Sequence, residues 1–369
     1  MLSIVAQSGG GPDAARRIVA RSTAGIPTLR DVARVASMSV STASRALNGD
    51  PTVTQALATR AREAALRLGY QPNTAARALR GRQNIVSLLA DDVGTEALAQ
   101  LATALEARVR ELGSNATVSS ADGDPQAQLE ALRTLRAMRP RALVLTGRWL
   151  TAPEAQSDIA SELELYATRD GGRVVIVGPT TLPFDSVEFA DFAAGVDVGR
   201  HMAATGGRSA VILAGWDIPG SFTERTRGFL HSLAAAGIRD VRTIHSRVTR
   251  DDGAAALASA LKVRVPDLVL ASNDRLALGA LRALEEHRLR VPEDVAVSGI
   301  DNVAVAADTS PALTSVGLPF AEAGVKAAGL ALSEAGTSIV RVKLTGELIV
   351  RDSTRVLRAS SRGPALEGF

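Results

Sequence analysis

Short apolar runs alternate with amphipathic helical stretches through residues 84–356, and this alternation restricts the possible folds more than any other feature of the chain. The runs are Ile85–Ala90, Ala142–Leu145, Val174–Val177, Ala210–Leu213, Leu268–Ala271 and Val295–Gly299. The helical stretches between them include Glu96–Leu112, Gln126–Met138 and Phe222–Ala236. Runs of this length without internal alternation are typical of strands buried on both faces. The pattern predicts parallel sheets covered by helices, and the segment is long enough for two such sheets.

Composition indicates a globular protein and excludes several kinds of site. Hydrophobic residues make up 46% of the chain and charged residues 22%. No apolar run approaches the roughly 20 residues that a membrane span needs. Because the chain has no cysteine, disulfides and thiolate metal sites are excluded. The N-terminus lacks the basic, apolar and small-residue regions of a signal peptide, so we expect a cytoplasmic protein.

Positive charge is concentrated in the first quarter of the chain. Residues 1–84 contain twelve arginines and four acids, a net charge of +8, so the remainder carries −5 within the total of +3. A genome biased towards arginine explains the kind of base, but it does not explain why acids avoid one end. A basic segment joined to an acidic body is typical of a nucleic-acid-binding domain on a globular protein.

Residues 28–68 have the pattern of three short helices. Thr28 and Ser39 are candidate N-caps for helices over about residues 29–36 and 40–47, and Asn48-Gly49 ends the second helix. A third helix is predicted over Thr54–Leu68. Two short helices with a break of three residues predict a helix-turn-helix, although the spacing also suits a helical hairpin that packs against another surface.

The outward face of the second helix has the composition of a DNA-reading surface. The expected outward residues are Val40, Ser41, Thr42, Ser44 and Arg45, and the expected inward residues are Met38, Ala43 and Leu47. Small side chains let a helix enter the major groove, hydroxyl groups reach phosphates or bases, and arginine can bind guanine with two hydrogen bonds. Thr28 and Ser39, at helix starts, are placed for phosphate contact.

The segment from Thr28 to Gln83, TLRDVARVASMSVSTASRALNGDPTVTQALATRAREAALRLGYQPNTAARALRGRQ, resembles the DNA-binding head of the LacI/GalR family of bacterial repressors. The resemblance implies that Val40, Ser41 and Arg45 read bases. It implies that the DNA backbone is held by Thr28, Ser39, Thr42, Ser44 and Asn48. Ala43 departs mildly from the family, which usually has valine there.

Residues 73–81 predict a short helix that begins at Asn73 and ends at Gly81. A helix of this length is marginal alone, and its local features equally suit a linker. The family resemblance implies a hinge helix over residues 73–83 that folds on operator DNA. Leu79 would be the wedge that enters the minor groove, with Ala76 and Arg77 on the same face. Residues 1–27 are expected to form a flexible arm.

Polar side chains follow three of the predicted strands. Arg225 opens the helix after the 210–213 strand, Asn273-Asp274 follows the 268–271 strand, and Asp301 follows the 295–299 strand. In open parallel sheets, ligands bind beyond the carboxyl ends of the strands. An arginine, an asparagine and an aspartate in one cleft could therefore hydrogen-bond a polyhydroxylated ligand. Each residue also has a simpler interpretation, as a helix cap or as a solvated charge.

The body resembles the effector domain of the same family, which is similar to periplasmic sugar-binding proteins. The matching stretches are RTRGF, VPDLVLASNDRLALGALRALEE, VPEDVAVSGIDN, SPALTSVGLPF and LIVRDST. The resemblance implies three crossings between two subdomains, the last near Glu347. It implies a pocket formed by Arg225, Asn273 and Asp301 with Ser221, Arg275 and Phe320 nearby. The loops 91–95 and 178–179 depart from the family pattern, and Trp216 is the best placed of the few aromatic residues.

The sequence thus predicts an α/β fold with an N-terminal helix-turn-helix head and a hinge helix, followed by a two-subdomain periplasmic-binding-protein-like core of parallel sheets. The predicted segments are a flexible arm at 1–27, a helix-turn-helix DNA-binding domain at 28–72, a hinge helix at 73–83, an effector-binding and dimerisation domain at 84–356 and a tail at 357–369.

The predicted function is that of a dimeric repressor that binds a pseudo-palindromic operator and responds to a sugar or sugar derivative, without cofactor or metal. Pairing of dimers into tetramers stays open. One alternative keeps the DNA-binding role with a degenerate pocket, so that the regulator is constitutive or controlled by a nucleoside or protein partner. Another is a small-molecule-binding protein. An enzyme is disfavoured, because the four histidines are widely separated and no nucleophile elbow or phosphate loop is present.

Overall fold

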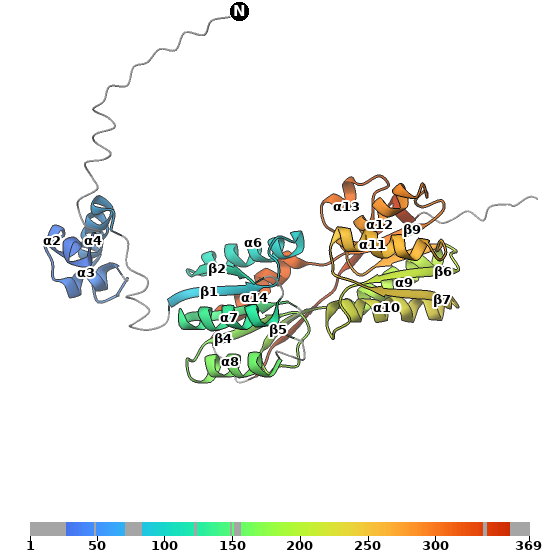
Figure 1. Cartoon of the computed structure of the whole chain (residues 1–369). Helices are drawn as coiled ribbons and strands as arrows, with labels where there is room; N and C mark the ends of the chain where they lie inside the picture. Colours follow the sequence, from blue (N-terminus) through green and yellow to red (C-terminus); the bar gives the residue numbers. More distant parts are fainter. Residues whose placement is uncertain are drawn as a thin grey trace, which may run out of the picture. The chain divides into compact units, whose positions relative to one another are not determined.

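The computed structural model describes residues 27–47, 49–70, 83–121, 124–147, 150, 156–334 and 338–354 (Figure 1). Contacts divide the chain into two compact units, Met1–Gly81 and Arg82–Phe369. Within the described ranges, no helix is long and apolar enough to cross a membrane.

The described residues of the first unit form three helices, each close to its predicted position. They are α2 (Leu29–Val35), α3 (Val40–Leu47) and α4 (Gln55–Leu68). A capping box between Thr28 and Asp31 begins α2, and Ser39 Oγ accepts a hydrogen bond from Thr42 N at 3.0 Å where α3 begins. Gly69 ends α4 with φ +64°, a conformation that favours glycine.

Small buried residues let these three helices pack closely. Val32, Ala36, Ala64 and Ala65 form the core of the first unit. The Arg60 guanidinium donates to the Ala36 carbonyl at 2.6 Å, which satisfies an acceptor at the end of α2. Of the three residues expected to face inward, Ala43 is fully buried, and Met38 and Leu47 are partly buried against the core.

The second unit contains two six-stranded sheets, each covered by helices on both faces. The strands of the first sheet are β1 (Gln83–Ala90), β2 (Asn115–Ser120), β3 (Pro140–Thr146), β4 (Arg173–Val177), β5 (Asp185–Phe189) and β11 (Arg341–Leu344). They are ordered β11-β5-β4-β3-β1-β2, and every pair is parallel. Helices α6 (Glu96–Glu111) and α14 (Phe320–Leu332) pack together on one face, and α7 (Pro125–Ala137) and α8 (Gln156–Thr168) cover the other (Figure 1).

The second sheet repeats this plan. Its strands are β6 (Ser209–Ala214), β7 (Asp240–His245), β8 (Leu268–Ala271), β9 (Ala296–Asp301), β10 (Thr314–Gly317) and β12 (Glu347–Ile349). They are ordered β12-β10-β9-β8-β6-β7, and β12 alone pairs antiparallel within this sheet. One face is covered by α9 (Asp191–Ala204) and α10 (Ser221–Ala235), and the other by α11 (Arg250–Leu261) and α12 (Asp274–Glu286). Two short elements, α13 (Val305–Asp308) and a 3₁₀ turn at Asp352–Thr354, complete the subdomain.

The chain crosses between the two sheets three times, as the sequence predicts. It leaves the first sheet after β5 and returns after β10 to form α14 and β11. The last crossing lies between β11 and β12, immediately before Glu347. The parallel order of the sheets brings the carboxyl ends of β1, β3, β6, β8 and β9 towards the space between the subdomains, where ligand sites are expected in such folds.

Candidate functional site

The outward face of α3 is exposed as predicted at three of its positions. Val40 is 43% exposed, and Ser41 and Arg45 are also exposed. Thr42 and Ser44 are half-buried, and the Thr42 hydroxyl lies 2.8 Å from Ser39 Oγ. The face therefore presents an apolar group, a hydroxyl and a guanidinium together, which is the chemistry that reads base edges in the major groove.

Thr28 is exposed, but its hydroxyl already has an intramolecular partner. Thr28 Oγ1 donates to Asp31 Oδ2 at 2.7 Å, and Arg34 donates to the other carboxylate oxygen at 2.8 Å. These hydrogen bonds lower the pKa of Asp31 to about 2, and the bond from the Thr28 side chain has the largest effect. A phosphate that approaches Thr28 must therefore compete with a charged carboxylate.

Five of the predicted DNA-contacting residues lie outside the described residues. They are Asn48, Asn73, Ala76, Arg77 and Leu79. The contact of Asn48 with the DNA backbone and the hinge role of the other four residues remain predictions from the sequence.

A cavity of about 680 Å³ lies between the two subdomains of the second unit. All seven residues predicted for a ligand pocket line it: Trp216, Ser221, Arg225, Asn273, Arg275, Asp301 and Phe320. The first subdomain contributes Asp91, Asp92, Glu96, Thr146 and Phe189. The volume falls within the range of roughly 300–1,000 Å³ that is usual for small-molecule sites.

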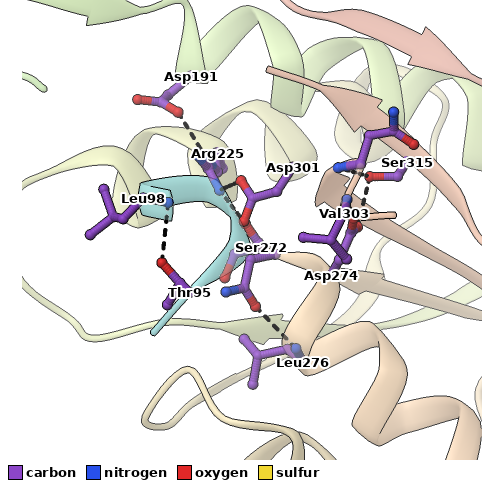
Figure 2. A network of polar contacts seen from close by, with 12 residues as sticks. Thr95, Leu98, Asp191, Arg225, Ser272, Asp274, Leu276, Asp301, Val303 and Ser315 are labelled. Carbon is purple, nitrogen blue, oxygen red and sulfur yellow. Dashed lines mark hydrogen bonds and ion pairs between the residues drawn. The ribbon is translucent and has the colours of Figure 1, made fainter. Parts of the chain in front are cut away.

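Arg225 is at the centre of the polar network in this cavity (Figure 2). Its side chain is 5% exposed, so its interpretation as a solvated helix charge is wrong. The guanidinium donates to Asp191 Oδ1 at 2.8 Å, to Asp301 Oδ1 at 3.0 Å and to the Ser272 carbonyl at 2.9 Å. Burial opposes the charged form, but the charges of Asp301 and Asp191 outweigh it and raise the pKa of Arg225.

Asp301 is held in an unusual backbone conformation at the end of β9. Its φ is +114°, and the φ of the next residue, Asn302, is +52°. The side chain is 12% exposed, and burial raises the pKa of Asp301 to about 6, although the Arg225 charge opposes this shift. Strained backbone of this kind clusters at ligand sites, because only a constrained environment maintains it.

Asn273 caps a helix, as the simpler interpretation of this residue predicts, and it also lines the cavity. Its Oδ1 atom accepts a hydrogen bond from Leu276 N at 3.0 Å and so caps α12. The cap uses only the carbonyl end of the side chain, which leaves the amide nitrogen as the end that can donate to a ligand.

Aromatic residues are scarce in the chain but gather in this cavity. Four of the eleven line it: Phe189, Trp216, Phe222 and Phe320. Trp216 and Phe222 meet edge to face with ring centroids 5.8 Å apart, and Phe189 and Phe320 lie 4.9 Å apart. Trp149, the other tryptophan of the chain, lies outside the described residues.

Sequence reasoning missed the residues that bridge or support the site from other elements. Asp92 pairs with Arg275 across the cavity at 3.4 Å, and Glu96 Oε1 accepts the Ala304 amide at 2.7 Å. Asp191 follows β5, a strand that the sequence did not predict, so the rule that flags residues after strands could not select it. Among the described residues, no group of three or more histidine or acidic side chains could hold a metal ion.

Comparisons with known proteins agree with this arrangement. Residues 28–73 match the family model of bacterial regulatory proteins of the lacI family, and residues 200–354 match the periplasmic-binding-protein-like domain. The transcriptional regulator CelR of Thermobifida fusca is 31% identical over 345 residues, covering 89% of this chain and 98% of CelR.

Two solved structures resemble the chain along most of its length. One is the lac repressor dimer bound to operator and the anti-inducer ONPF, with a TM-score of 0.76 and 25% identity, covering 89% of this chain and 99% of that chain. The other is the complex of the regulator CelR with cellobiose, with a TM-score of 0.66, 26% identity and the same two coverages. The chain therefore belongs to the lacI family of bacterial regulatory proteins and is a transcriptional regulator with a DNA-binding head and an effector-binding core.

Proposed function

We propose that the chain represses transcription as a dimer on a pseudo-palindromic operator, and that a sugar or sugar derivative in the cavity changes its operator affinity. The observation that carries the ligand proposal is the cavity itself. Its lining combines the Arg225–Asp301 ion pair, the Asn273 side-chain amide and the aromatic rings of Trp216 and Phe222. Hydroxyl groups need polar partners from several directions, and the apolar faces of a sugar ring need an aromatic surface.

The comparisons support this choice of ligand. CelR, a relative in sequence and structure, is known in complex with cellobiose. The present cavity has the size of a small-molecule site, so a sugar of one or two rings is a reasonable occupant. In this proposal the ligand is bound without chemical change, and the regulator acts in the cytoplasm, where its operator lies.

On the DNA side, the proposal assigns base reading to Val40, Ser41 and Arg45. Backbone contacts are assigned to Thr28, Ser39, Thr42, Ser44 and Asn48. The segment with Asn73, Ala76, Arg77 and Leu79 is assigned to the minor groove. A dimer would place two α3 helices on the half-sites of the operator, with a spacing fixed by its symmetry.

The test begins with selection of operator sequences from random duplex DNA by the purified full-length protein. We expect a pseudo-palindrome with a flexible central step, and Arg45→Ala should relax the preference at one position of each half-site. No enriched sequence at moderate salt would contradict the operator proposal. Unchanged operator affinity and bending in Leu79→Ala would contradict the hinge assignment.

A panel of mono- and disaccharides, with nucleosides alongside, is then screened for shifts in affinity on the selected operator. We expect a sugar to act, and Arg225→Met or Asp301→Ala to abolish its effect while operator binding without sugar persists. A response to a nucleoside alone would identify a different ligand class. If no compound acts, the ligand proposal fails and leaves the DNA-binding role intact.

A further inference from the structure

The turn that follows β9 is strained at two successive positions. Asp301 and Asn302 both have positive φ, at +114° and +52°, and neither is glycine. Residues with side chains rarely adopt this backbone, and they keep it only where neighbouring groups hold it. The turn is directly followed by Val303, another residue that lines the cavity.

The carboxyl group of one buried residue, Asp274, holds the amides of this turn (Figure 2). Asp274 Oδ2 accepts the Val303 amide at 2.9 Å, and Asp274 Oδ1 accepts the Ser315 hydroxyl at 2.7 Å. Ser315 Oγ in turn accepts the Asn302 amide at 3.0 Å. Two consecutive backbone donors are therefore fixed by Asp274, one directly and one through Ser315.

The position of Asp274 excludes a direct ligand contact. Its relative exposure is 0%, and it does not line the cavity, although its neighbours Asn273 and Arg275 do. Gly299 on β9 makes room for it, because a Cβ at that position would collide with Asp274 Oδ1. The strand β9 thus leaves room for a buried carboxyl group at the start of α12, and this group forms hydrogen bonds with the turn and with Ser315.

We propose that Asp274 is a positioning residue for the ligand cavity: together with Ser315 it holds the turn at residues 301–303 and so fixes the Asp301 carboxylate beside Arg225. The proposal rests on the ligand role assigned to the cavity above. Without the two hydrogen bonds the strained turn can relax, and Asp301 can leave the place where it accepts from Arg225 Nη1 at 3.0 Å. A ligand that relies on Asp301 then has to reorder the turn when it binds.

Four substitutions separate this role from a general contribution to the core. Asp274→Ala removes both hydrogen bonds, whereas Asp274→Asn keeps an acceptor for the Val303 amide and a donor towards Ser315 Oγ. Ser315→Ala removes the link to Asn302. Ser298→Ala is the matched control, because Ser298 is equally buried on β9 and its hydroxyl has no hydrogen-bond partner in the described structure.

The first experiment needs no ligand. Hydrogen–deuterium exchange of the full-length protein is followed at the amides of Asn302 and Val303. We expect exchange about tenfold faster or more in Asp274→Ala and, at Asn302, in Ser315→Ala, with wild-type rates in Asp274→Asn and Ser298→Ala. Unchanged exchange in Asp274→Ala would overturn the proposal. Should that variant fail to fold, unchanged exchange at Asn302 in Ser315→Ala decides against it.

The second experiment measures affinity for the sugar that the wild-type protein selects from the panel, together with operator affinity without sugar. We expect Asp274→Ala to weaken sugar binding about tenfold or more, Asp274→Asn to restore it to within about threefold, and operator affinity to stay within about twofold in both. Equal losses in sugar and operator affinity would indicate a merely structural role and overturn the proposal. If no sugar binds the wild type, the ligand proposal fails, whereas exchange at the turn still decides whether Asp274 holds it.

Discussion

Arg225 is the side chain whose removal should affect the body most. It is buried between two carboxylates, Asp191 and Asp301, and leaving buried charges without a partner is more costly than losing an exposed ion pair. We expect Arg225→Met to lower the free energy of unfolding by about 3 kcal/mol near pH 8. The loss should be smaller near pH 5, where the carboxyl group of Asp301, whose pKa is raised to about 6 by burial, can take up a proton. Urea denaturation at the two pH values measures both effects.

Arg227, two residues further along α10, provides the control. Its side chain is 62% exposed and pairs with Glu224, so Arg227→Met should change the free energy of unfolding by less than about 1 kcal/mol. Equal losses in the two variants would show that the network around Arg225 contributes no more than a surface ion pair.

The stability of the body should also depend on pH through its buried acids. Burial raises the pKa of Asp274 to about 8, helped by the Asp301 charge, and burial raises that of Asp301 to about 6. The native state therefore holds two protons that the unfolded state releases near pH 4, so the contribution of these two groups to stability is full below pH 4 and is lost as the pH rises from 4 to 8. His201 has the opposite sign, because burial lowers its pKa.

Asp274→Asn isolates the part of this effect that belongs to Asp274. Calorimetry between pH 5 and pH 8.5 should show a flatter fall of the melting temperature in the variant than in the wild type, with the largest difference above pH 7. Parallel curves for the two proteins would mean that Asp274 does not titrate in this range.

At the scale of elements, α14 offers two glycines with opposite expectations. A Cβ at Gly324 would collide with the Leu101 carbonyl on α6, whereas a Cβ at Gly329 would meet nothing within 4 Å. Because the collision is with backbone, Gly324→Ala should push the helices apart and lower the free energy of unfolding by about 2 kcal/mol. Gly329→Ala should raise it by up to about 1 kcal/mol, since alanine restricts the unfolded chain. Thermal or urea unfolding compares them, and unchanged stability in Gly324→Ala would contradict the close packing of α14 on α6.

Apolar strands inside the sheets could be predicted from the sequence, whereas edge strands could not. All six predicted strands are present, and each is central in its sheet. The strands β2 and β7 were missed because they lie at sheet edges, where partial exposure to solvent allows polar residues and removes the continuous apolar run. The interior strands β5 and β10 were missed as well, because polar residues interrupt their apolar runs. The short strands β11 and β12 lie on either side of the last crossing. Each pairs with a strand that is distant in the sequence, so local pattern alone does not predict them.

The residues of the ligand cavity likewise divide into those that could be predicted from the sequence and those that could not. Arg225, Asn273 and Asp301 follow central strands and were predicted, and the resemblance to a family added Ser221, Arg275 and Phe320. Asp191, Asp92 and Glu96 were missed as site residues, since their partners are distant in the chain and only the fold brings them together. Backbone strain at Asp301 could not be predicted from the sequence, because aspartate adopts a positive φ more often than most residues but still only in a minority of cases.

At the scale of the whole body, two of the contacts that join the subdomains across the cavity should differ in strength. Arg275 and Asp92 are 34% and 52% exposed and lie 3.4 Å apart, so solvent weakens their attraction. Glu96 accepts the Ala304 amide at 2.7 Å, a charge-assisted hydrogen bond, and Ala304 directly follows the strained turn. The second contact therefore links the position of Asp301 to closure of the cavity.

Removing each contact should separate their contributions to ligand binding. We expect Glu96→Ala to weaken affinity for the selected sugar about tenfold, because the closed arrangement loses its stronger contact, and Asp92→Ala to weaken it by less than about threefold. A double-mutant cycle between Glu96→Ala and Asp274→Ala then tests whether the turn couples ligand to closure. Coupling predicts a combined loss smaller than the product of the single losses, since either change alone frees the turn. Independent effects that multiply would show that closure and Asp301 placement are separate events.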